Sequence, residues 1–540
     1  MRQAIDVSQF PWIRPLVSTY ANNFASVASL FAGDPADETA WRSTIARVQH
    51  APHDRARLAA ILERQLAGRN APPEARHAAA RLRDPTSVAV VTGQQAGLFG
   101  GPLYTLLKAV SAVLVARRAQ ATYGTPTVAV FWVDAEDHDW DEVHAADVLD
   151  ADFVPRRIAL ARVDGAGQRP VASLLLDDQV RQTCAELEAA LTPTEFTAEL
   201  LTSLRRHYRP GESVATAFAA WMDELVGRHG LVVFDGADAE AKPLVADIFA
   251  RELERPGSTS RLAREAGDTL AHLGHEPQVE PADDTAALLY LGHAGRQPIK
   301  WRDHDAVIGD TVRAASDVQA EAGAHPERFS PNVLLRPIVQ DRLFPTIAYV
   351  AGPSELAYQA QLGGVYRSFG VEAPLLCPRA SATLLDAAAA RFLDRSHLPL
   401  QALHADDDAA LNALLEGQLP PVVEQTLKDT ERELVRRIGV IKGAVGTIDP
   451  TLEGAVETTV ERMRDTLTDL HAKIIRAAKR KDDTLRRQFT RSRALAFPGG
   501  HPQERVLSVA FFVNRYGPAM VDRLIDVLPV EAGKHYILTL

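Results

Sequence analysis

The sequence predicts an α/β fold in which helices cover a largely parallel β-sheet. Short apolar runs typical of buried strands alternate with longer segments whose apolar residues recur at helical spacing. Strand–helix–strand units of this kind are crossovers that join parallel strands. Loops rich in glycine or in charged residues follow several of the apolar runs. Because ligands bind beyond the carboxyl ends of the strands in such sheets, we expect a Rossmann-like core with its site in those loops.

The clearest crossover unit lies in residues 81–150, which we assign to the first part of the core. Ser87–Thr92 is a short apolar run that predicts a buried strand, and a glycine-rich loop follows it. Pro102 occupies the position expected for the first residue of a helix, and Gly124 the position where that helix should end. A second strand is predicted at Thr127–Val133, directly before an acidic loop.

Two later segments, 211–255 and 331–385, repeat this pattern and should complete the same sheet. Their predicted strands are Leu231–Phe234, Thr346–Val350 and Pro374–Cys377. A single helix is expected from about Ser354 to Ser368, and Ser354 is a candidate for its N-cap.

Three segments should lie outside the core sheet. Residues 1–80 read as helical and are expected to pack on the core. Residues 151–210 and 256–330 are expected to be insertions. The second insertion should contain a β-hairpin, formed by strands at Thr285–Gly292 and Gln297–Arg302.

The last third of the chain predicts an antiparallel α-helical coiled coil in residues 386–495. Two apolar stripes are separated by a turn, and the second stripe alternates in steps of four and three at Val456, Val460, Met463, Leu467, Leu470 and Ile474. Heptads do not reveal function, so self-association as a homodimer and a lid both stay open. Residues 496–540 form a final segment that should end in a short strand.

The composition excludes several classes of protein. The net charge of −11, from 59 basic and 70 acidic residues, argues against a general nucleic-acid binder. Two cysteines, Cys184 and Cys377, are too few for a disulfide framework or a four-cysteine zinc site. No apolar run is long enough for a membrane span, and the first residues lack the apolar stretch of a signal peptide. We therefore expect a cytoplasmic protein.

The glycine-rich loop Thr92–Gly101 is the first candidate for substrate binding. Glycines let a ligand approach the backbone, and the start of the following helix offers free N–H groups for a carboxylate or phosphate. The spacing matches neither the dinucleotide fingerprint nor the P-loop. A turn that merely suits the fold is an equal alternative. The residues proposed for substrate binding are Thr92, Gly93, Gln94, Gln95, Gly100 and Gly101.

The acidic loop Glu136–Asp139 is the candidate for catalysis. Asp137, His138 and Asp139 follow the second strand and could bind a substrate ammonium, hold a metal or act as a general base. The cluster shows no clear zinc-ligand spacing, so no metal is predicted. The alternative is an acidic helix N-terminus stabilised by the helix dipole, which is the expected role of the carboxylates that follow.

A third loop spans Asn332–Glu355. Arg336 and Arg342 are candidate anion clamps, because a guanidinium can bind a carboxylate through two hydrogen bonds. Asn332, Gly352 and Glu355 complete the predicted substrate-binding set, although Gly352–Glu355 could equally serve only to cap a helix.

Four runs in the chain resemble one known family. They are TGQQAGLFGGPLYTLLKAVSAV, FWVDAEDHDWDEV, NVLLRPIVQDRLFPTIAYVAGPSELAYQAQL and, near the end, QERVLS with NRYGPAMVDRLI. Long motifs in the same order resemble the cysteine ligase (BshC) family of bacillithiol biosynthesis. The resemblance covers about residue 85 to the end.

The resemblance implies a Rossmann-like core similar to class I aminoacyl-tRNA synthetases, with connecting-peptide insertions and a coiled coil that supports dimerisation. It implies a C–N ligase that joins L-cysteine to glucosaminyl malate as an amide in bacillithiol synthesis. It also implies binding of ATP or ADP, for which Arg379, Ser381 and Arg505 are the expected contacts.

Amide formation from a free carboxylate needs activation, for which ATP is the natural driver. The chain has no recognisable HIGH or KMSKS signature, so an acyl-adenylate and an acyl-phosphate both stay open. Two alternatives to the ligase are a non-catalytic, nucleotide-binding dimeric accessory protein of the same pathway and a nucleotidyl transferase acting on another small substrate.

Overall fold

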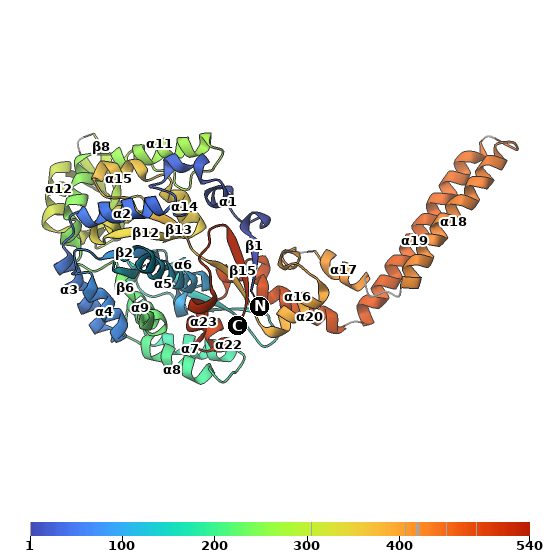
Figure 1. Cartoon of the computed structure of the whole chain (residues 1–540), viewed down its shortest axis with the longest axis horizontal. Coiled ribbons are helices and arrows are strands. Elements are labelled where there is room, and N and C mark those ends of the chain that lie inside the picture. The colour runs from blue at the N-terminus through green and yellow to red at the C-terminus, as the bar shows by residue number, and fades with distance from the viewer. Residues whose placement is uncertain (1, 304, 406, 417–420, 450, 482) are drawn as a thin grey trace. The chain divides into compact units, whose positions relative to one another are not determined.

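The computed structural model describes residues 2–540 except 304, 406, 417–420, 450 and 482 (Figure 1). These residues form two compact units, the first made of residues 1–384 and 502–540 and the second of residues 385–501. None of the described helices is both long and apolar enough to cross a membrane.

The first unit is built on a five-stranded parallel sheet, as predicted. The strand order is β13-β12-β2-β3-β6, and each neighbouring pair is parallel. The strands are β2 (Val88–Gln94), β3 (Thr127–Val133), β6 (Leu231–Asp235), β12 (Thr346–Ala351) and β13 (Leu375–Pro378). Nearly every residue in these strands is buried, because helices cover both faces of the sheet.

Helices of the core begin close to the predicted positions, with two corrections. Pro102 is the N-cap of α5 (Leu103–Tyr123) and not its first residue. The single helix expected from Ser354 to Ser368 is two helices, α14 (Pro353–Gln359) and α15 (Gly363–Phe369), and Gly352 rather than Ser354 is the N-cap.

The break between α14 and α15 has a tertiary cause. The buried side chain of Gln361 accepts hydrogen bonds from the backbone N–H groups of Gln278 and Val279, each at 2.9 Å. It also donates to the carbonyl of Val279 at 2.8 Å. These contacts lie about eighty residues away in sequence, so the local pattern could not indicate them.

The N-terminal segment is helical as predicted, except at its start. Its helices are α1 (Pro15–Asn22), α2 (Glu38–His50), α3 (Arg55–Gly68) and α4 (Pro73–Arg81). Residues Arg2–Asp6 form β1, which pairs with β15 (Lys534–Thr539), and β15 pairs in turn with β14 (Ser381–Leu385). The helical interpretation is therefore wrong for β1, because its hydrogen-bond partner is the other end of the chain.

The first insertion contains a two-stranded antiparallel sheet and helices. Its elements are β4 (Ala145–Leu149), β5 (Pro155–Ala159), α7 (Gln179–Ala190) and α8 (Thr197–His207). The helix α9 (Val214–Val226) then returns the chain to the core.

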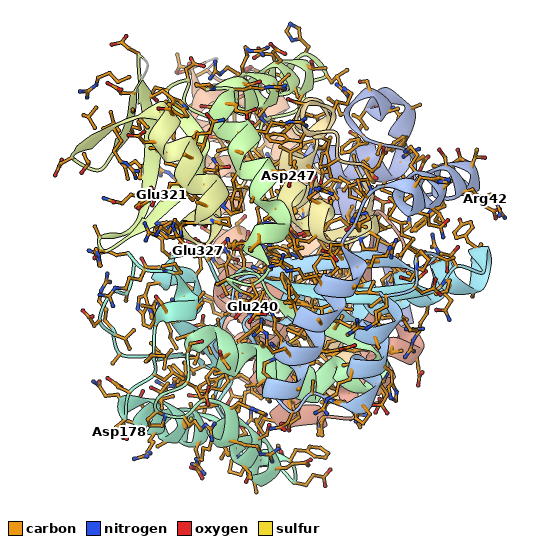
Figure 2. All side chains as sticks on the ribbon, turned by 90° about the vertical axis from the view of Figure 1, so that its left-hand side faces the viewer. Arg42, Asp178, Glu240, Asp247, Glu321 and Glu327 are labelled. Atoms are coloured by element: carbon orange, nitrogen blue, oxygen red, sulfur yellow. The ribbon has the colours of Figure 1, made fainter. Side chains whose placement is uncertain are left out.

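The second insertion contains the predicted hairpin within a larger sheet of order β10-β9-β8-β7-β11. The strands are β7 (Thr285–Gly292), β8 (Gly295–Arg302), β9 (Asp305–Ile308), β10 (Thr311–Ala314) and β11 (Phe329–Pro331). Helices α10 (Ala246–Glu254), α11 (Ser258–His272), α12 (Ala315–Ala324) and α13 (Arg336–Leu343) surround it or follow it. In Figure 2, Glu321 on α12 lies above Asp178, which precedes α7 at the lower left of the view.

The second unit contains the predicted helical hairpin, formed by α18 (Pro421–Val445) and α19 (Leu452–Lys481). Ion pairs join Glu424 to His471 at 3.1 Å and Glu431 to Arg464 at 3.6 Å. Residue numbers rise along one helix as they fall along the other, so the two helices are antiparallel. The described residues of this unit also form α16 (Ala387–Ser396), α17 (Ala409–Glu416) and α20 (Asp483–Ala496).

The chain returns to the first unit after residue 501. Its last helices are α21 (Gln503–Val506), α22 (Val509–Tyr516) and α23 (Met520–Val527), and all three belong to the first unit. The backbone N–H of Leu103 donates to the carbonyl of Leu507 at 2.9 Å. The final segment thus packs against the start of α5, beside the glycine-rich loop.

Candidate active site

A cleft of about 690 Å³ lies at the carboxyl ends of β2, β3 and β12. All three predicted loops contribute to its walls, as expected for a parallel sheet. The predicted residues that line it are Gly93, Gln94, Gln95, Asp137, Asn332, Arg336, Gly352, Glu355, Arg379 and Arg505.

Several predicted residues lie outside the cleft walls. Thr92 donates its hydroxyl to the carbonyl of Val350 at 2.9 Å, which joins two core strands. Gly100 packs against the side chains of Trp221 and Val509. Gly101 lies beside a smaller hollow near Gln95. These residues therefore support the backbone of the glycine-rich loop without lining the cleft.

The side chains of the acidic loop lie in different environments. The carboxylate of Asp137 lines the cleft, while the side chain of Asp139 accepts from the N–H of Asp141 at 3.1 Å and caps α6 (Trp140–Val143). His138 does not line the cleft, and its Nδ1 lies 3.5 Å from Nη1 of Arg296. The capping alternative thus describes the position of Asp139, and Asp137 is the member of the trio that lines the cleft.

Glu136, at the start of the same loop, turns away from the cleft. Its carboxylate forms a buried ion pair with Lys242, which also donates to the carbonyl of Phe329 at 3.1 Å. The pair joins the acidic loop to β11. A sequence that places four polar residues side by side could not show which of them turns inward.

Arg342 is a correction to the predicted anion clamp. It lies at the end of α13, pairs with Asp247 at 3.2 Å and donates to the carbonyl of Pro52 at 2.6 Å. Arg336, at the start of the same helix, lines the cleft. Because the helix separates the two arginines, only one can reach the carboxyl ends of the strands.

Lys108, on α5, is a buried ammonium that the sequence interpretation missed. Its Nζ donates to the carbonyl of Gly93, to Oε1 of Gln94 at 3.1 Å and to Oε2 of Glu355 at 2.6 Å. Three acceptors use the three N–H bonds of the ammonium. Lys108 therefore ties the glycine-rich loop to the third loop.

Glu355 is held as a carboxylate at this junction. It accepts from Tyr349 Oη at 2.5 Å and from the N–H of Gly352 at 2.7 Å. Burial alone would raise the pKa of Glu355, but the ammonium of Lys108 and these hydrogen bonds hold that pKa below its ordinary value. The third loop thus presents a fixed negative charge to the cleft.

Asp134 and Arg336 form a second pair of opposite charges in the cleft. Asp134 directly follows β3, and its Oδ2 lies 4.0 Å from Nε of Arg336. Burial raises the pKa of Asp134, although Arg336 opposes this effect. Arg336 also donates to Gln340 and to Tyr358, each at 3.1 Å. The position after a buried strand was the signal that could have identified Asp134.

The cationic side chain of Arg296 lies at a long distance from Asp137. The N–H of His138 donates to its Oδ1 at 2.8 Å, while Nη1 of Arg296 lies 3.4 Å from the same oxygen. Nε2 of Gln95 is 3.3 Å from Oδ2 and also bonds to Glu142. Burial and the neighbouring carboxylates raise the pKa of Glu142. This side of the cleft therefore concentrates negative charge.

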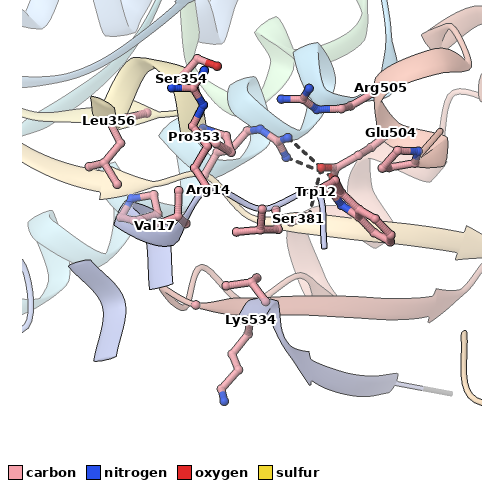
Figure 3. Close-up of a pocket in the computed structure, with 18 of the residues that line it drawn as sticks. Trp12, Arg14, Val17, Pro353, Ser354, Leu356, Ser381, Glu504, Arg505 and Lys534 are labelled. Atoms are coloured by element: carbon pink, nitrogen blue, oxygen red, sulfur yellow. Dashed lines mark hydrogen bonds and ion pairs between the residues drawn. The ribbon is translucent and has the colours of Figure 1, made fainter. Parts of the chain in front are cut away.

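A smaller cavity of about 160 Å³ adjoins the cleft (Figure 3). Both are lined by Arg379, Arg505 and the segment 352–354. The guanidinium of Arg379 is paired with Glu504 at 2.7 Å, and Ser381 donates to the same carboxylate at 3.1 Å. All three predicted nucleotide contacts thus surround this cavity, which also contains Trp12, Arg14 and Lys534.

Among the described residues, no group of three or more histidine, cysteine or acidic side chains is arranged to hold a metal ion. The two cysteines are buried, and burial raises the pKa of Cys377 to about 12 and that of Cys184 to about 11. Neither thiol belongs to the cleft.

Comparison with known families matches both units of the chain. The model for the N-terminal Rossmann-like domain of bacillithiol biosynthesis BshC matches residues 3–380, and the model for its C-terminal coiled-coil domain matches residues 382–540. The chain belongs to the BshC family. Family membership associates it with bacillithiol biosynthesis and agrees with the parallel sheet and the helical hairpin seen in the structure.

Individual relatives match over nearly their whole length. A BshC protein of Salinibacter ruber is 34% identical over 96% of this chain and 95% of its own. A BshC protein of Koribacter versatilis is 34% identical over 89% of each chain, and one of Symbiobacterium thermophilum is 32% identical over 96% of each. All three carry the name "Putative cysteine ligase BshC".

Proposed function

We propose that this protein is a C–N ligase that joins L-cysteine to glucosaminyl malate with the consumption of ATP. The observation that carries the proposal is the cleft itself, in which Asp134, Asp137 and Glu142 lie with Arg296 and Arg336 at the carboxyl ends of parallel strands. Such a site suits substrates that have both an amine and carboxylates. The names of the relatives support the ligase reaction.

Asp137 is the proposed general base. The amine of glucosaminyl malate must lose a proton as it attacks the activated cysteine carboxyl, and a cleft-lining carboxylate with loose partners can accept that proton. Arg336 would stabilise negative charge that develops on the carbonyl oxygen. Lys108 and Glu355 position the two loops and are not assigned to proton transfer.

The smaller cavity is the proposed nucleotide site. Its residues fit a nucleotide, because Trp12 offers an aromatic surface for a base and Arg14 and Arg505 offer positive charge for phosphates, whereas Lys534 is paired with Asp6 at 3.2 Å. Bound ATP would supply the activation of the cysteine carboxylate. Arg505 lines both cavities, so we assign it to the phosphates nearest the cleft, while Arg379 and Ser381 hold the cavity wall through Glu504.

We also propose a homodimer through the helical hairpin of the second unit. Val440, Ile441 and Ile448 are 67%, 51% and 78% exposed, which is unusual for large apolar side chains on one helix and its turn. Ile441→Glu with Ile448→Glu should convert the dimer to a monomer in sedimentation velocity. Thr459→Glu, an exposed position on α19, is the control and should leave the dimer intact. A monomeric wild-type protein would reject this assembly.

The ligase proposal is tested with purified protein, ATP, L-cysteine and glucosaminyl malate, and the product is measured by mass spectrometry. We expect bacillithiol from the wild type and from Asp178→Asn, whose carboxylate is exposed and lies outside the cleft. Asp137→Asn should lose most of the activity. Nucleotide binding without any product from the folded wild type would favour the non-catalytic accessory protein.

A further inference from the structure

Arg296 belongs to the second insertion but reaches the core site. It lies at the start of β8, and its backbone N–H donates to the carbonyl of Gln168 in the first insertion at 3.0 Å. Its side chain lines the cleft. The hairpin of the second insertion thus contacts the first insertion. The side chain of this arginine lies at the carboxyl end of β3, beside Asp137.

Two hydrogen bonds hold the guanidinium of Arg296 in place. Nε donates to Oγ of Ser330 at 3.1 Å, and Nη2 donates to the carbonyl of Pro331 at 2.8 Å. Both partners lie in β11, and the arginine side chain is only 10% exposed. The orientation of the group is therefore set before any ligand arrives.

The remaining nitrogen of this guanidinium is loosely bound. Nη1 lies 3.4 Å from Oδ1 of Asp137 and 3.5 Å from Nδ1 of His138. Charge-assisted hydrogen bonds between nitrogen and a carboxylate are normally about 2.7–2.9 Å long. An oriented, buried cation with such long contacts can bind an anion at modest cost in reorganisation.

Two of the other cleft arginines, Arg379 and Arg505, differ from Arg296, and Arg336 is already assigned to the charge that develops on the carbonyl oxygen. Arg379 makes two hydrogen bonds to Glu504, at 2.7 and 3.0 Å, and so already has a close carboxylate partner. Arg505 lines both the smaller cavity and the cleft, whereas Arg296 lines the cleft and not the smaller cavity. A ligand of Arg296 is therefore separate from the proposed nucleotide site, which favours a substrate carboxylate over a phosphate.

We propose that Arg296 binds a carboxylate of the malate group of the acceptor substrate through Nη1. This inference rests on the proposed function for the identity of the substrate. When the carboxylate binds, Nη1 of Arg296 loses its contact with Asp137 and donates to the ligand instead. Asp137 then becomes available to the attacking amine. One insertion residue thus links recognition of the acceptor to the readiness of the general base.

The first experiment measures binding without catalysis. L-Malate is titrated calorimetrically into the wild type, Arg296→Lys and Arg296→Ala. We expect malate to bind the wild type roughly ten times or more tightly than Arg296→Ala, and Arg296→Lys to be intermediate, because a point charge replaces an oriented guanidinium. Dimethyl malate, which lacks the charges, should bind all three weakly. Arg302→Ala, an exposed arginine on the same strand, is the matched control and should bind as the wild type does.

A variant that keeps Arg296 tests the positioning. Ser330→Ala removes the partner of Nε and should weaken malate binding several-fold while the guanidinium is retained. This variant also answers the concern that Arg296→Ala perturbs folding. In assays of the full reaction, Arg296→Lys should raise KM for glucosaminyl malate and leave KM for ATP and for cysteine unchanged.

The results distinguish this inference from the proposed function. Absence of malate binding by the wild type, or equal affinity of the wild type and Arg296→Ala, would overturn the role of Arg296 even if the protein is a ligase. Conversely, malate binding that depends on Arg296 in a protein without ligase activity would reject the proposed reaction and keep the carboxylate site.

Discussion

Nζ of Lys108 and Oε2 of Glu355 lie 2.6 Å apart and join the helix after β2 to the helix after β12. The lysine side chain is 2% exposed and the glutamate side chain 18%, so the pair is shielded from solvent on the lysine side. The same ammonium contacts Gly93 and Gln94. Two walls of the cleft therefore depend on one cation.

Lys108→Met should damage both stability and activity. The substitution leaves the carboxylate of Glu355 without its cation and two further acceptors without a donor, which costs about 3 kcal/mol in the free energy of unfolding. We expect activity to fall at least a hundredfold, measured as kcat beside urea unfolding. Lys300→Met, at an exposed position of β8, should change neither quantity. Normal unfolding and normal kcat in Lys108→Met would contradict this role.

Asp137 and Asp139 should respond differently to substitution. Asp137→Asn keeps the size of a cleft-lining side chain but removes the charge, so kcat should fall while the free energy of unfolding changes little. Asp139→Ala removes the cap of α6 and should cost about 1 kcal/mol of stability with a smaller effect on kcat. Paired measurements of thermal unfolding and kcat check the contrast. The reverse order of effects would make Asp139 the functional carboxylate.

Glu252 should make stability depend on pH. Its carboxyl, on α10, accepts from the N–H of Ala287 on β7 of the second insertion at 2.7 Å, and burial raises its pKa to about 7. An acid with a raised folded-state pKa contributes stability that is complete below its unfolded pKa, near 4.5, and is lost as the pH rises through about 7. Relative to Glu252→Gln, the wild type should therefore lose up to roughly 3 kcal/mol between acidic and neutral pH.

Urea unfolding of both proteins at several pH values measures this difference. Asp223 and Asp341 also have pKa values raised to about 6 by burial, so the comparison with Glu252→Gln isolates the effect of one carboxyl. Glu254→Gln, an exposed position on the same helix, should keep the pH dependence of the wild type. Parallel curves for the wild type and Glu252→Gln would contradict the prediction.

Gly100 should tolerate no side chain. Its φ is +88°, and an added Cβ would lie 2.5 Å from the ring of Trp221 and 2.9 Å from Val509. Gly100→Ala should therefore destabilise the protein by about 3 kcal/mol, through both backbone strain and overpacking. Gly124→Ala has a similar φ of +68° but no atom within 4 Å of the added Cβ, so it should cost only about 1 kcal/mol. Equal effects in thermal unfolding would show that packing against Trp221 is unimportant.

Much of the core could be predicted because its signals are local. The runs at Thr127–Val133 and Thr285–Gly292 coincide with β3 and β7. The loops after β2, β3 and β12 meet at one cleft because parallel strands end at one edge. The similarity of the core to aminoacyl-tRNA synthetases and the identity of the nucleotide contacts stay predictions.

The site residues that escaped prediction are those whose partners are distant in sequence. Asp134 pairs with Arg336, and Lys108 pairs with Glu355, so the role of each residue depends on a partner far away in the chain. Arg296 reads as one of several arginines in a hairpin until β11 orients it toward Asp137. Charge and spacing along the chain do not reveal such pairs.

The sequence by itself determined the alternation of strands and helices, the polar loops at strand ends and the helical hairpin, since hydrophobic periodicity and turn residues act over a few positions. Tertiary structure decided the rest. It paired Arg2–Asp6 with the last strand, turned Glu136 toward Lys242 and left Asp137 facing the cleft. The physical reason is that a buried charge or an unpaired strand edge must find a partner, and the folded chain supplies partners from hundreds of residues away.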